Sequence, residues 1–292
     1  MFHAGGPRAA RFFCQNWRMD QTAPRIRFLI GGAQKAGTTA LARLLAQHPG
    51  IALPDRLPEG QVAPPGDMGA AWCKEAHVFD APDYDERWSP AEVDARFAVR
   101  FTRLDDARLH GDATPVSMYH PRVVERVRRY NPAMRWIVLL RDPVERAISH
   151  YFMERARGAE ALPLLRALLA EPGRLHGSFD DMSPTAAWRR ASYVDRGRYG
   201  RQLDRLTRMF PADQVLLLRS RDLASDPRAS LRRVLAFLGV ADADLRPAGS
   251  PVLRGDYAPP PPHAPARWWL RWKLRGEKPR LRARYGVDLD AP

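Results

Sequence analysis

Short hydrophobic runs alternate along this chain with stretches in which apolar residues return every three or four positions. The runs cover residues 26–31 (IRFLIG), 135–140 (RWIVLL) and 214–219 (QVLLLR), and the second lies between Asn-Pro and Arg-Asp-Pro. Runs of this length are typical of buried strands, whereas the three-to-four spacing is typical of helices. Strands that alternate with helices predict an α/β fold with a parallel, doubly wound sheet.

The helical spacing is clear after each predicted strand and in two places between them. Pro143 suits the first turn of one of these helices, because a proline at that position loses no helical hydrogen bond. The apolar positions that repeat are Leu41, Leu44 and Leu45; Val123, Val124 and Val127; Val144, Ile148, Tyr151 and Phe152; Leu203, Leu206 and Phe210; and Leu231, Val234, Leu235 and Leu238.

Three segments interrupt the alternation and suggest how the chain is divided. Residues 54–71 are rich in proline and glycine and predict a loop, residues 74–80 (KEAHVFD) have an extended character, and prolines 259–262 end the regular pattern. We therefore predict an N-terminal extension (1–24), a single domain (25–250) and a basic, aromatic C-terminal tail (251–292).

Composition adds a preference for anionic partners. The chain has 292 residues, 45% of them hydrophobic, and 47 lysines and arginines against 33 acidic residues give a net charge of +14. Such a chain is expected to be globular and to attract phosphates, acidic glycans, nucleic acid or a membrane surface. Charge alone selects none of these partners, because an arginine-rich composition is also a general property of some proteomes.

Cysteine usage and hydropathy bear on the compartment. Cys14 and Cys73 are too few for a disulfide framework or a metal cluster, which fits a reducing compartment. The first 24 residues lack a clean apolar run before a cleavage site, and no apolar stretch approaches the roughly 20 residues that span a bilayer. We expect a cytoplasmic protein without a signal peptide.

The stretch 31–41 (GGAQKAGTTAL) lies where a phosphate-binding loop is expected, between a strand and a helix. The P-loop pattern G-x-x-x-x-G-K-[ST] has a lysine directly after its second glycine. Here Gly32 and Gly37 keep the spacing, but Thr38 takes the lysine's position and Lys35 lies two residues before Gly37. A strand–loop–helix connection still directs N–H groups toward an anion. We predict a P-loop-like, phosphate-binding loop with a different donor.

Two segments, GAQKAGTTAL and IVLLRDPVERAISHY, resemble the signature segments of sulfotransferases that use 3′-phosphoadenosine 5′-phosphosulfate (PAPS). The resemblance is to the bacterial and heparan-sulfate-type carbohydrate branch of that family, and it spans residues 26–240. It implies a PAPS-binding α/β fold that requires no metal ion. The supporting segments are KEAHVFD, GDATP, YVDRGRYGRQLDRLTRMFP and LLLRSRDLASDP with LRRVLAFLG.

The resemblance also implies which residues bind the donor. The first loop is expected to hold the 5′-phosphosulfate, and Arg141 with Ser149 the 3′-phosphate. A guanidinium and a hydroxyl suit a phosphate dianion, and Arg141 lies at the carboxyl end of a predicted parallel strand. Tyr199, in the turn RGRY, is expected to line the nucleotide site or to pack at the start of a helix. The donor-binding residues of the first loop are Lys35, Ala36, Gly37, Thr38 and Thr39.

The catalytic glutamate of the carbohydrate branch falls on Glu75 in KEAHVFD, with His77 and Asp80 as assisting neighbours. In an extended segment Glu75, His77 and Phe79 share one face, so that a carboxylate and an imidazole meet one acceptor hydroxyl. We expect Glu75 to take the acceptor proton and His77, protonated beside a carboxylate, to orient the acceptor. Lys35 is expected to neutralise charge on the leaving phosphate.

The predicted reaction is sulfuryl transfer from PAPS to an acceptor hydroxyl on a carbohydrate or glycoconjugate, without a nucleic-acid partner or a metal. Two differences from the heparan-type enzymes concern the acceptor: Ala113 stands where they commonly have a lysine, and no cysteine follows Cys73 to close a basic C-terminal loop. A P-loop kinase or NTPase and a non-catalytic protein that binds anions or membrane surfaces are the alternatives.

The tail segment 266–282 (ARWWLRWKLRGEKPRLR) mixes tryptophans with basic residues. Three interpretations stay open. The segment suits an amphipathic helix at the surface of an anionic membrane, which predicts peripheral membrane contact. It also suits an aromatic and basic wall for a sugar acceptor, or a helix that packs its tryptophans on the core.

Overall fold

The computed structural model describes residues 24–57, 74–243 and 264–291. Five strands form one sheet in the order β2-β3-β1-β4-β5, and every neighbouring pair is parallel. The strands are β1 (Ile26–Gly32), β2 (Ile51–Ala52), β3 (Leu109–Asp112), β4 (Arg135–Leu140) and β5 (Val215–Arg219). The α-helices are α1 (Thr38–Leu45), α3 (Pro90–Ala98), α4 (Pro121–Tyr130), α5 (Pro143–Ala156), α6 (Leu164–Leu175), α7 (Ala187–Arg190), α8 (Tyr199–Met209), α9 (Ser220–Ser225), α10 (Pro227–Leu238), α11 (Ala264–Leu274) and α12 (Glu277–Tyr285), and the 3₁₀-helices are η1 (Ser178–Asp180), η2 (Asp195–Gly197) and η3 (Ala212–Gln214).

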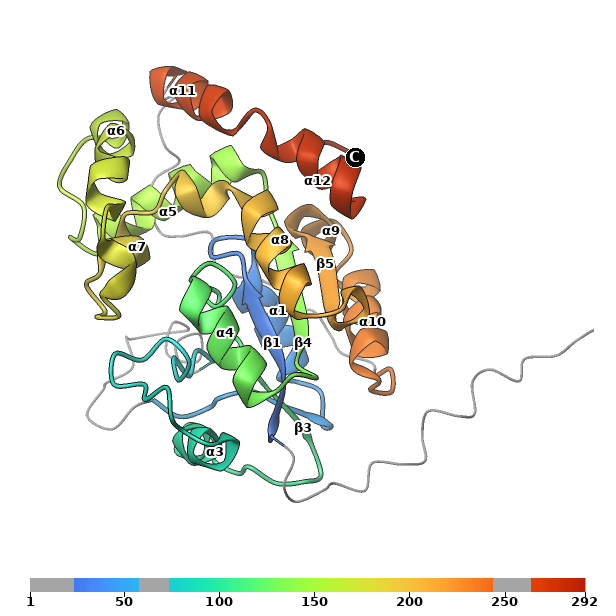
Figure 1. The fold of residues 1–292 in the computed structure, drawn as a ribbon. Coiled ribbons are helices and arrows are strands. Elements are labelled where there is room, and N and C mark those ends of the chain that lie inside the picture. The colour runs from blue at the N-terminus through green and yellow to red at the C-terminus, as the bar shows by residue number, and fades with distance from the viewer. Residues whose placement is uncertain (1–23, 58–73, 244–263, 292) are drawn as a thin grey trace, which may run out of the picture.

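The order of the strands positions the site. β1 lies between β3 and β4, so the chain leaves β1 through α1 toward one edge and later crosses through α4 to the other side of β1. Figure 1 shows α4 and α8 in front of the sheet and α1 behind it. In sheets of this kind, ligands bind beyond the carboxyl ends of the strands where the strand order reverses. Here this region contains the loop after β1 and Arg141 after β4.

The sheet is buried on both faces, which explains why its central strands read as continuous hydrophobic runs. Residues 136–140 of β4 are fully buried, and Trp136 meets Phe210 at the end of α8 edge to face, with ring centroids 5.4 Å apart. A second hydrophobic cluster joins α5, α6 and α11, and α11 contributes Leu270 and Leu274 to it. The tail helix α11 therefore packs on the body of the protein.

The predicted single-domain, parallel α/β architecture is confirmed. The three predicted strands correspond to β1, β4 and β5, and the five helical patterns to α1, α4, α5, α8 and α10. The sequence pattern did not reveal β2, which has two residues, or β3, whose sequence LHGD is mostly polar. β3 pairs with β1 on one side and with β2 on the other, so neighbouring strands hold it in the sheet.

Residues 74–80 were predicted to be extended, and this prediction is wrong. The segment contains no strand, and His77 adopts a left-handed backbone with φ of 54°. Most of the predicted loop 54–71 and of the N-terminal extension lies outside the described residues. In the tail, α12 buries Leu281 in the main core, and Arg280 and Tyr285 both bond to Asp204 of α8.

Candidate active site

The connection between β1 and α1 uses its two motif glycines for different purposes. Gly37 adopts φ of 98° directly before α1 begins at Thr38, a left-handed conformation that glycine accepts without a steric penalty. At Gly32, a Cβ would lie 2.6 Å from the sulfur of Met118, so a larger residue would force the Met118 side chain to move. The N–H groups at the start of α1 then face the carboxyl end of the sheet, as an anion site requires.

Lys35 and His77 share an unusual backbone. Within the described part of the chain, they are the only non-glycine residues with φ in the left-handed region, at 72° and 54°. Such a conformation costs about 1–3 kcal/mol in a non-glycine residue and is concentrated at functional sites. Beside Lys35, Ala36 and Thr38 are buried and Thr39 is partly exposed.

Lys35 lies among cationic side chains. Burial, then repulsion from Arg157 and Arg141, lowers the pKa of Lys35 to about 8, although Glu154 opposes the shift. The fully buried Arg146 adds to the positive field, and its Nε and Nη1 atoms find no hydrogen-bond partner among the described residues. An excess of cations in a partly buried site favours ligands with several negative charges.

Arg141 connects the segment after β4 to the loop after β1. Its Nη1 donates to the backbone carbonyl of Lys35 at 3.1 Å, and the hydroxyl of Tyr199 donates to the carbonyl of Arg141 at 3.1 Å. Tyr199 is fully buried, so its link to the site runs through Arg141. Ser149 is buried on α5, about two helical turns beyond Arg141.

The neighbouring carboxylates do not hold Arg141. Asp142 instead contacts Lys278 at 2.6 Å, and Glu145 pairs with Arg267. Both partners come from the C-terminal helices. The acidic neighbours of Arg141 in the sequence therefore pair with the tail.

Arg196 links the loop to a second cluster of polar residues. It lies fully buried in η2, and its Nη1 donates to the side-chain oxygen of Gln34 in the loop. Its Nη2 donates to the backbone carbonyls of Trp188 at 2.6 Å and of Arg189 at 3.1 Å. Arg189, on α7, in turn pairs with Asp80 at 2.5 Å.

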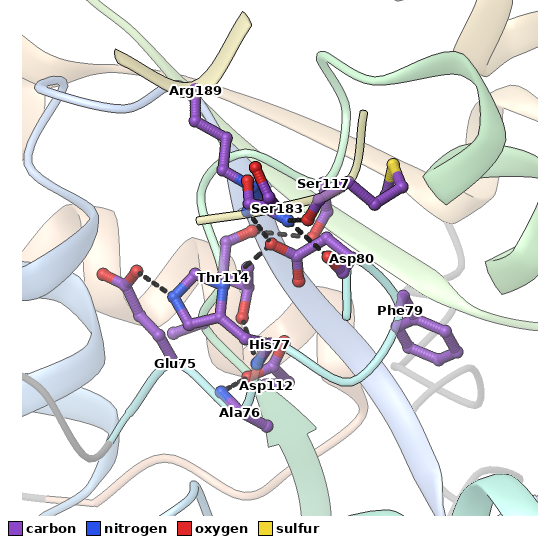
Figure 2. A network of polar contacts seen from close by, with 12 residues as sticks. Glu75, Ala76, His77, Phe79, Asp80, Asp112, Thr114, Ser117, Ser183 and Arg189 are labelled. Carbon is purple, nitrogen blue, oxygen red and sulfur yellow. Dashed lines mark hydrogen bonds and ion pairs between the residues drawn. The ribbon is translucent and has the colours of Figure 1, made fainter. Parts of the chain in front are cut away.

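The second cluster contains the predicted acid–base residues. Nε2 of His77 lies 3.2 Å from Oε2 of Glu75, and Nδ1 of the same ring lies 2.8 Å from Oδ2 of Asp80. Figure 2 shows the two carboxylates approaching the imidazole from different sides. Lys74 contacts Oε1 of Glu75 at 2.5 Å. Charges of alternating sign therefore run from Lys74 through the cluster to Arg189.

These contacts control the charge of both predicted catalytic groups. Burial acts to raise the pKa of Glu75, but the Lys74 ammonium and His77 outweigh it and hold the value at about 2. For His77, burial acts to lower the pKa, whereas Asp80 and then Glu75 raise it to about 10. Near neutral pH, Glu75 is a carboxylate and His77 an imidazolium whose side chain remains 46% exposed.

The backbone of this segment is held by the end of β3 and the turn after it. Oδ1 of Asp112 accepts the N–H of Ala76 at 2.8 Å, and Oγ1 of Thr114 accepts the N–H of His77 at 3.3 Å. Phe79 was expected on the face of Glu75 and His77, but it points away from them (Figure 2) into an aromatic cluster of the core. The left-handed turn at His77 removes the alternation that an extended segment has.

Three contributors were missed by sequence reasoning. The cation that contacts Glu75 is Lys74, the first residue of the KEAHVFD segment, and its adjacency in the sequence was the available signal. Arg196 lies in the RGRY segment, but nothing in the sequence indicates that it reaches Gln34. Nothing in the sequence predicts the contact of Arg189 with Asp80, because only the fold brings α7 to Asp80.

The loop after β1 and the carboxylate–histidine pair of Glu75 and His77 belong to a parallel α/β sheet protein, an arrangement that suits a transferase. The sequence matches the profile of the Sulfotransferase family over residues 27–244, and the chain belongs to that family.

Similar proteins agree with this assignment. The chain is 30% identical over 212 residues to heparan sulfate glucosamine 3-O-sulfotransferase 6 of Mus musculus, which covers 73% of this chain and 52% of that protein. It is 27% identical over 245 residues to the bifunctional heparan sulfate N-deacetylase/N-sulfotransferase 2 of Homo sapiens, covering 77% of this chain and 23% of that protein. The chain thus spans about half the length of the first relative. The crystal structure of a sulfotransferase from Alicyclobacillus acidocaldarius superposes with a TM-score of 0.67 at 26% identity, over 90% of this chain and 97% of the other.

Proposed function

We propose that this protein transfers a sulfuryl group from PAPS to a hydroxyl of a carbohydrate or glycoconjugate. The observation that carries the proposal is the contact of Glu75 with His77, which is connected through Asp80, Arg189 and Arg196 to the loop that contains Lys35. The heparan sulfate sulfotransferases among the similar proteins support a sugar as the acceptor.

The donor's two phosphate positions match two groups of residues. The amides at the start of α1, with Lys35 and Thr38, suit the 5′-phosphosulfate, because N–H groups and an ammonium neutralise a phosphate that takes on charge as the sulfuryl group leaves. Arg141 and Ser149 suit the 3′-phosphate. The bond between Arg141 and the Lys35 carbonyl supports this assignment, since it joins the two positions.

Glu75 is proposed to accept the acceptor's proton. In the transfer, the acceptor oxygen forms a bond to sulfur, the bond from sulfur to the bridging phosphate oxygen breaks, and the hydroxyl proton moves to Glu75. A carboxylate with a pKa of about 2 is a weak base, so it takes the proton late, once the forming bond has made the hydroxyl acidic. The electron pair of the broken bond stays on the phosphate, near Lys35.

The remaining cluster residues hold Glu75 in its charged state and in place. Lys74, almost fully buried, donates to Glu75 and also to the carbonyl of Ala113 at 3.0 Å, which ties the carboxylate to the segment after β3. His77 is charged and directs its two N–H groups at Glu75 and Asp80, so it is not free to accept a proton; it orients the acceptor by holding the Glu75 carboxylate that receives the acceptor's hydrogen bond. Glu75 is thus proposed as the base and His77 as the orienting residue.

A transfer assay with ³⁵S-labelled PAPS and a panel of sugars, glycolipids, phenols and peptides tests the proposal. We expect label on one carbohydrate class and release of adenosine 3′,5′-bisphosphate. Transfer that persists in a chelator separates this activity from that of a kinase or NTPase. Phosphate release from ATP that depends on Mg²⁺, without sulfuryl transfer, would contradict the proposal in favour of the P-loop alternative.

Peripheral membrane contact through α11 is a second proposal with its own observation. Trp268 and Trp272 lie one turn apart and expose 70% and 47% of their surfaces, while the opposite face of the helix packs Leu270 and Leu274 on α5 and α6. No helix in the described part of the chain is long and apolar enough to cross a bilayer. Exposed tryptophans with basic neighbours suit the interface of an anionic membrane, where each basic residue adds about 1 kcal/mol.

Co-sedimentation with vesicles that contain phosphatidylserine, at low salt, tests this contact. We expect the protein to pellet with the vesicles, and the Trp268→Ser/Trp272→Ser variant to stay in the supernatant. Val99→Ser is the matched control, because Val99 is 66% exposed directly after α3, away from the tail. Failure of the unmodified protein to pellet would exclude membrane contact through α11.

A further inference from the structure

A cavity lies where α6, the η2–α8 segment and α11 come together, apart from the proposed transfer site. Figure 1 shows α11 beside α6 at the top of the molecule, and the two helices are in contact. The cavity has a volume of about 490 Å³, and neither Lys35, Glu75 nor His77 lines it. This volume falls in the range of about 300–1,000 Å³ that is usual for small-ligand sites.

The carboxyl groups in the wall of the cavity are already engaged by the protein. Asp195 accepts a hydrogen bond from the hydroxyl of Tyr119 at 2.8 Å and pairs with Arg201. Glu171 is buried and accepts the backbone N–H groups of Val194 and Asp195, both at 2.7 Å. Burial raises the pKa of Glu171 to about 7, which further reduces the negative charge of this wall.

The cationic groups of the wall are less completely paired. Arg205 donates to the backbone carbonyl of Tyr119 at 3.1 Å and forms no ion pair within 4 Å among the described residues. Arg198 and Lys273 form no ion pair with any residue in the described part of the chain, and both line the cavity. The hollow therefore has an excess of positive charge that a bound anion would compensate.

Aromatic side chains form the rest of the wall. The rings of Tyr119 and Phe179 pack together with centroids 5.6 Å apart. Trp269 of α11 also lines the cavity, and the ammonium of Lys273 lies 5.5 Å from its ring centroid. Aromatic faces bind the apolar face of a pyranose ring, while guanidinium and ammonium groups bind its carboxylate or sulfate substituents. An acidic sugar has both an apolar ring face and anionic substituents.

We propose that this cavity is a binding site for an acidic saccharide unit, one that carries a carboxylate or a sulfate, and that it is separate from the transfer site. Arg198 and Lys273 bind the anionic substituents, and Trp269 contacts the face of the ring. The proposal concerns binding alone, so it does not depend on whether the protein transfers a sulfuryl group.

Isothermal titration calorimetry with a heparin-derived disaccharide, which carries carboxylate and sulfate groups, tests the site. We expect binding to the unmodified protein and none to maltose at the same concentration. Arg198→Gln and Lys273→Gln should each weaken binding about threefold to fivefold, the range of a partly exposed ion pair, and the double variant at least about tenfold.

Arg271→Gln is the matched control, because Arg271 is an exposed cation on the same helix that does not line the cavity. Its affinity should stay within twofold, and all variants should keep the melting temperature of the unmodified protein. Equal losses in Arg271→Gln and Lys273→Gln would reduce the effect to general charge attraction and overturn the proposal. Unchanged affinity in the double variant would also overturn it, since the disaccharide would then bind elsewhere, including at the transfer site.

Discussion

The two halves of the candidate active site arrange their charges in opposite ways. Around Lys35, the nearby groups that most affect its charge are mainly of the same sign, including Arg157, Arg141 and Arg146. His77, by contrast, lies between two groups of the opposite charge, the carboxylates of Glu75 and Asp80. The first arrangement is electrostatically incomplete until an anion binds, whereas the second is neutralised within the protein.

This difference appears in the pKa values. The pKa of Lys35 is lowered to about 8, chiefly by burial and by the neighbouring arginines, whereas the pKa of His77 is raised to about 10 by its two carboxylates. A bound phosphate will change the environment of Lys35 strongly and that of His77 little. Donor binding and proton transfer should therefore respond differently to mutation and to pH.

Removal of the base should affect turnover most. Glu75→Gln keeps the size of the side chain but removes its basicity, so turnover should fall by roughly 10²–10⁴-fold while nucleotide affinity stays nearly unchanged. Initial-rate assays with saturating PAPS and calorimetry with adenosine 3′,5′-bisphosphate measure the two quantities. Glu125→Gln, at an exposed position on α4, is the control and should be silent.

His77→Ala should cost less than Glu75→Gln, because an imidazolium orients the acceptor but does not accept its proton. A smaller fall in turnover, together with a rise in KM for the acceptor, is expected. Near-normal turnover in Glu75→Gln with an inactive His77→Ala would show that the two roles are reversed.

The next effect should appear in donor binding. Arg141 is expected to contact the 3′-phosphate, so Arg141→Gln should weaken adenosine 3′,5′-bisphosphate binding by about 10–100-fold, the range of a lost charge-assisted hydrogen bond. Adenosine 5′-phosphate should lose much less, because it lacks the second phosphate. Calorimetry with both nucleotides, with and without Mg²⁺, measures this selectivity, and Arg208→Gln on the exposed side of α8 is the matched control. Equal affinity of the unmodified protein for both nucleotides and for ATP would contradict the assignment.

The smallest expected effect is on the pH dependence of nucleotide affinity. Lys35 attracts phosphate when it is protonated, and its pKa of about 8 means that this charge is complete below pH 8 and is lost as the pH rises through 8. Affinity for adenosine 3′,5′-bisphosphate should thus fall between pH 7 and pH 9, by at most about tenfold per pH unit above 8. Glu75 and His77, with pKa values of about 2 and 10, do not titrate in this window.

Lys35→Arg supplies the control for this pH profile, because an arginine stays charged over the whole range. Its nucleotide affinity should be nearly independent of pH from 7 to 9. A profile of the same slope in Lys35→Arg and in the unmodified protein would assign the pH dependence to another group.

Much of the arrangement around Lys35 could be predicted from the sequence because it is local. Lys35, Gly37 and Thr38 lie within one strand–loop–helix connection, and the position of Arg141 follows from the rule that parallel strands end at the same edge of the sheet. The strands themselves were predictable because burial on both faces leaves a continuous hydrophobic run. Where that signal is absent, as in the polar β3, the prediction failed.

For the cluster around His77, the sequence predicted the types of residue but not their arrangement. Glu75, His77 and Asp80 were predicted from their segment, but their geometry was not, because His77 turns left-handed while Asp112 and Thr114 hold the backbone from the region of β3. A local pattern predicts regular structure and contains no signal for such a turn. As a consequence, the side chain of Phe79 lies in the core and not in the site.

Hydrophobic periodicity predicted strands β1, β4 and β5 and helices α1, α4, α5, α8 and α10, because burial and backbone geometry act over a few neighbouring residues. The links within the site join distant parts of the chain: Arg196 reaches Gln34 across 162 positions and Arg189 reaches Asp80 across 109. Only folding brings these groups within hydrogen-bond distance, where the low dielectric of the interior makes their charges count. The same folding places α11 over α5 and α6, which makes Trp268 and Trp272 exposed and Trp269 part of a cavity wall.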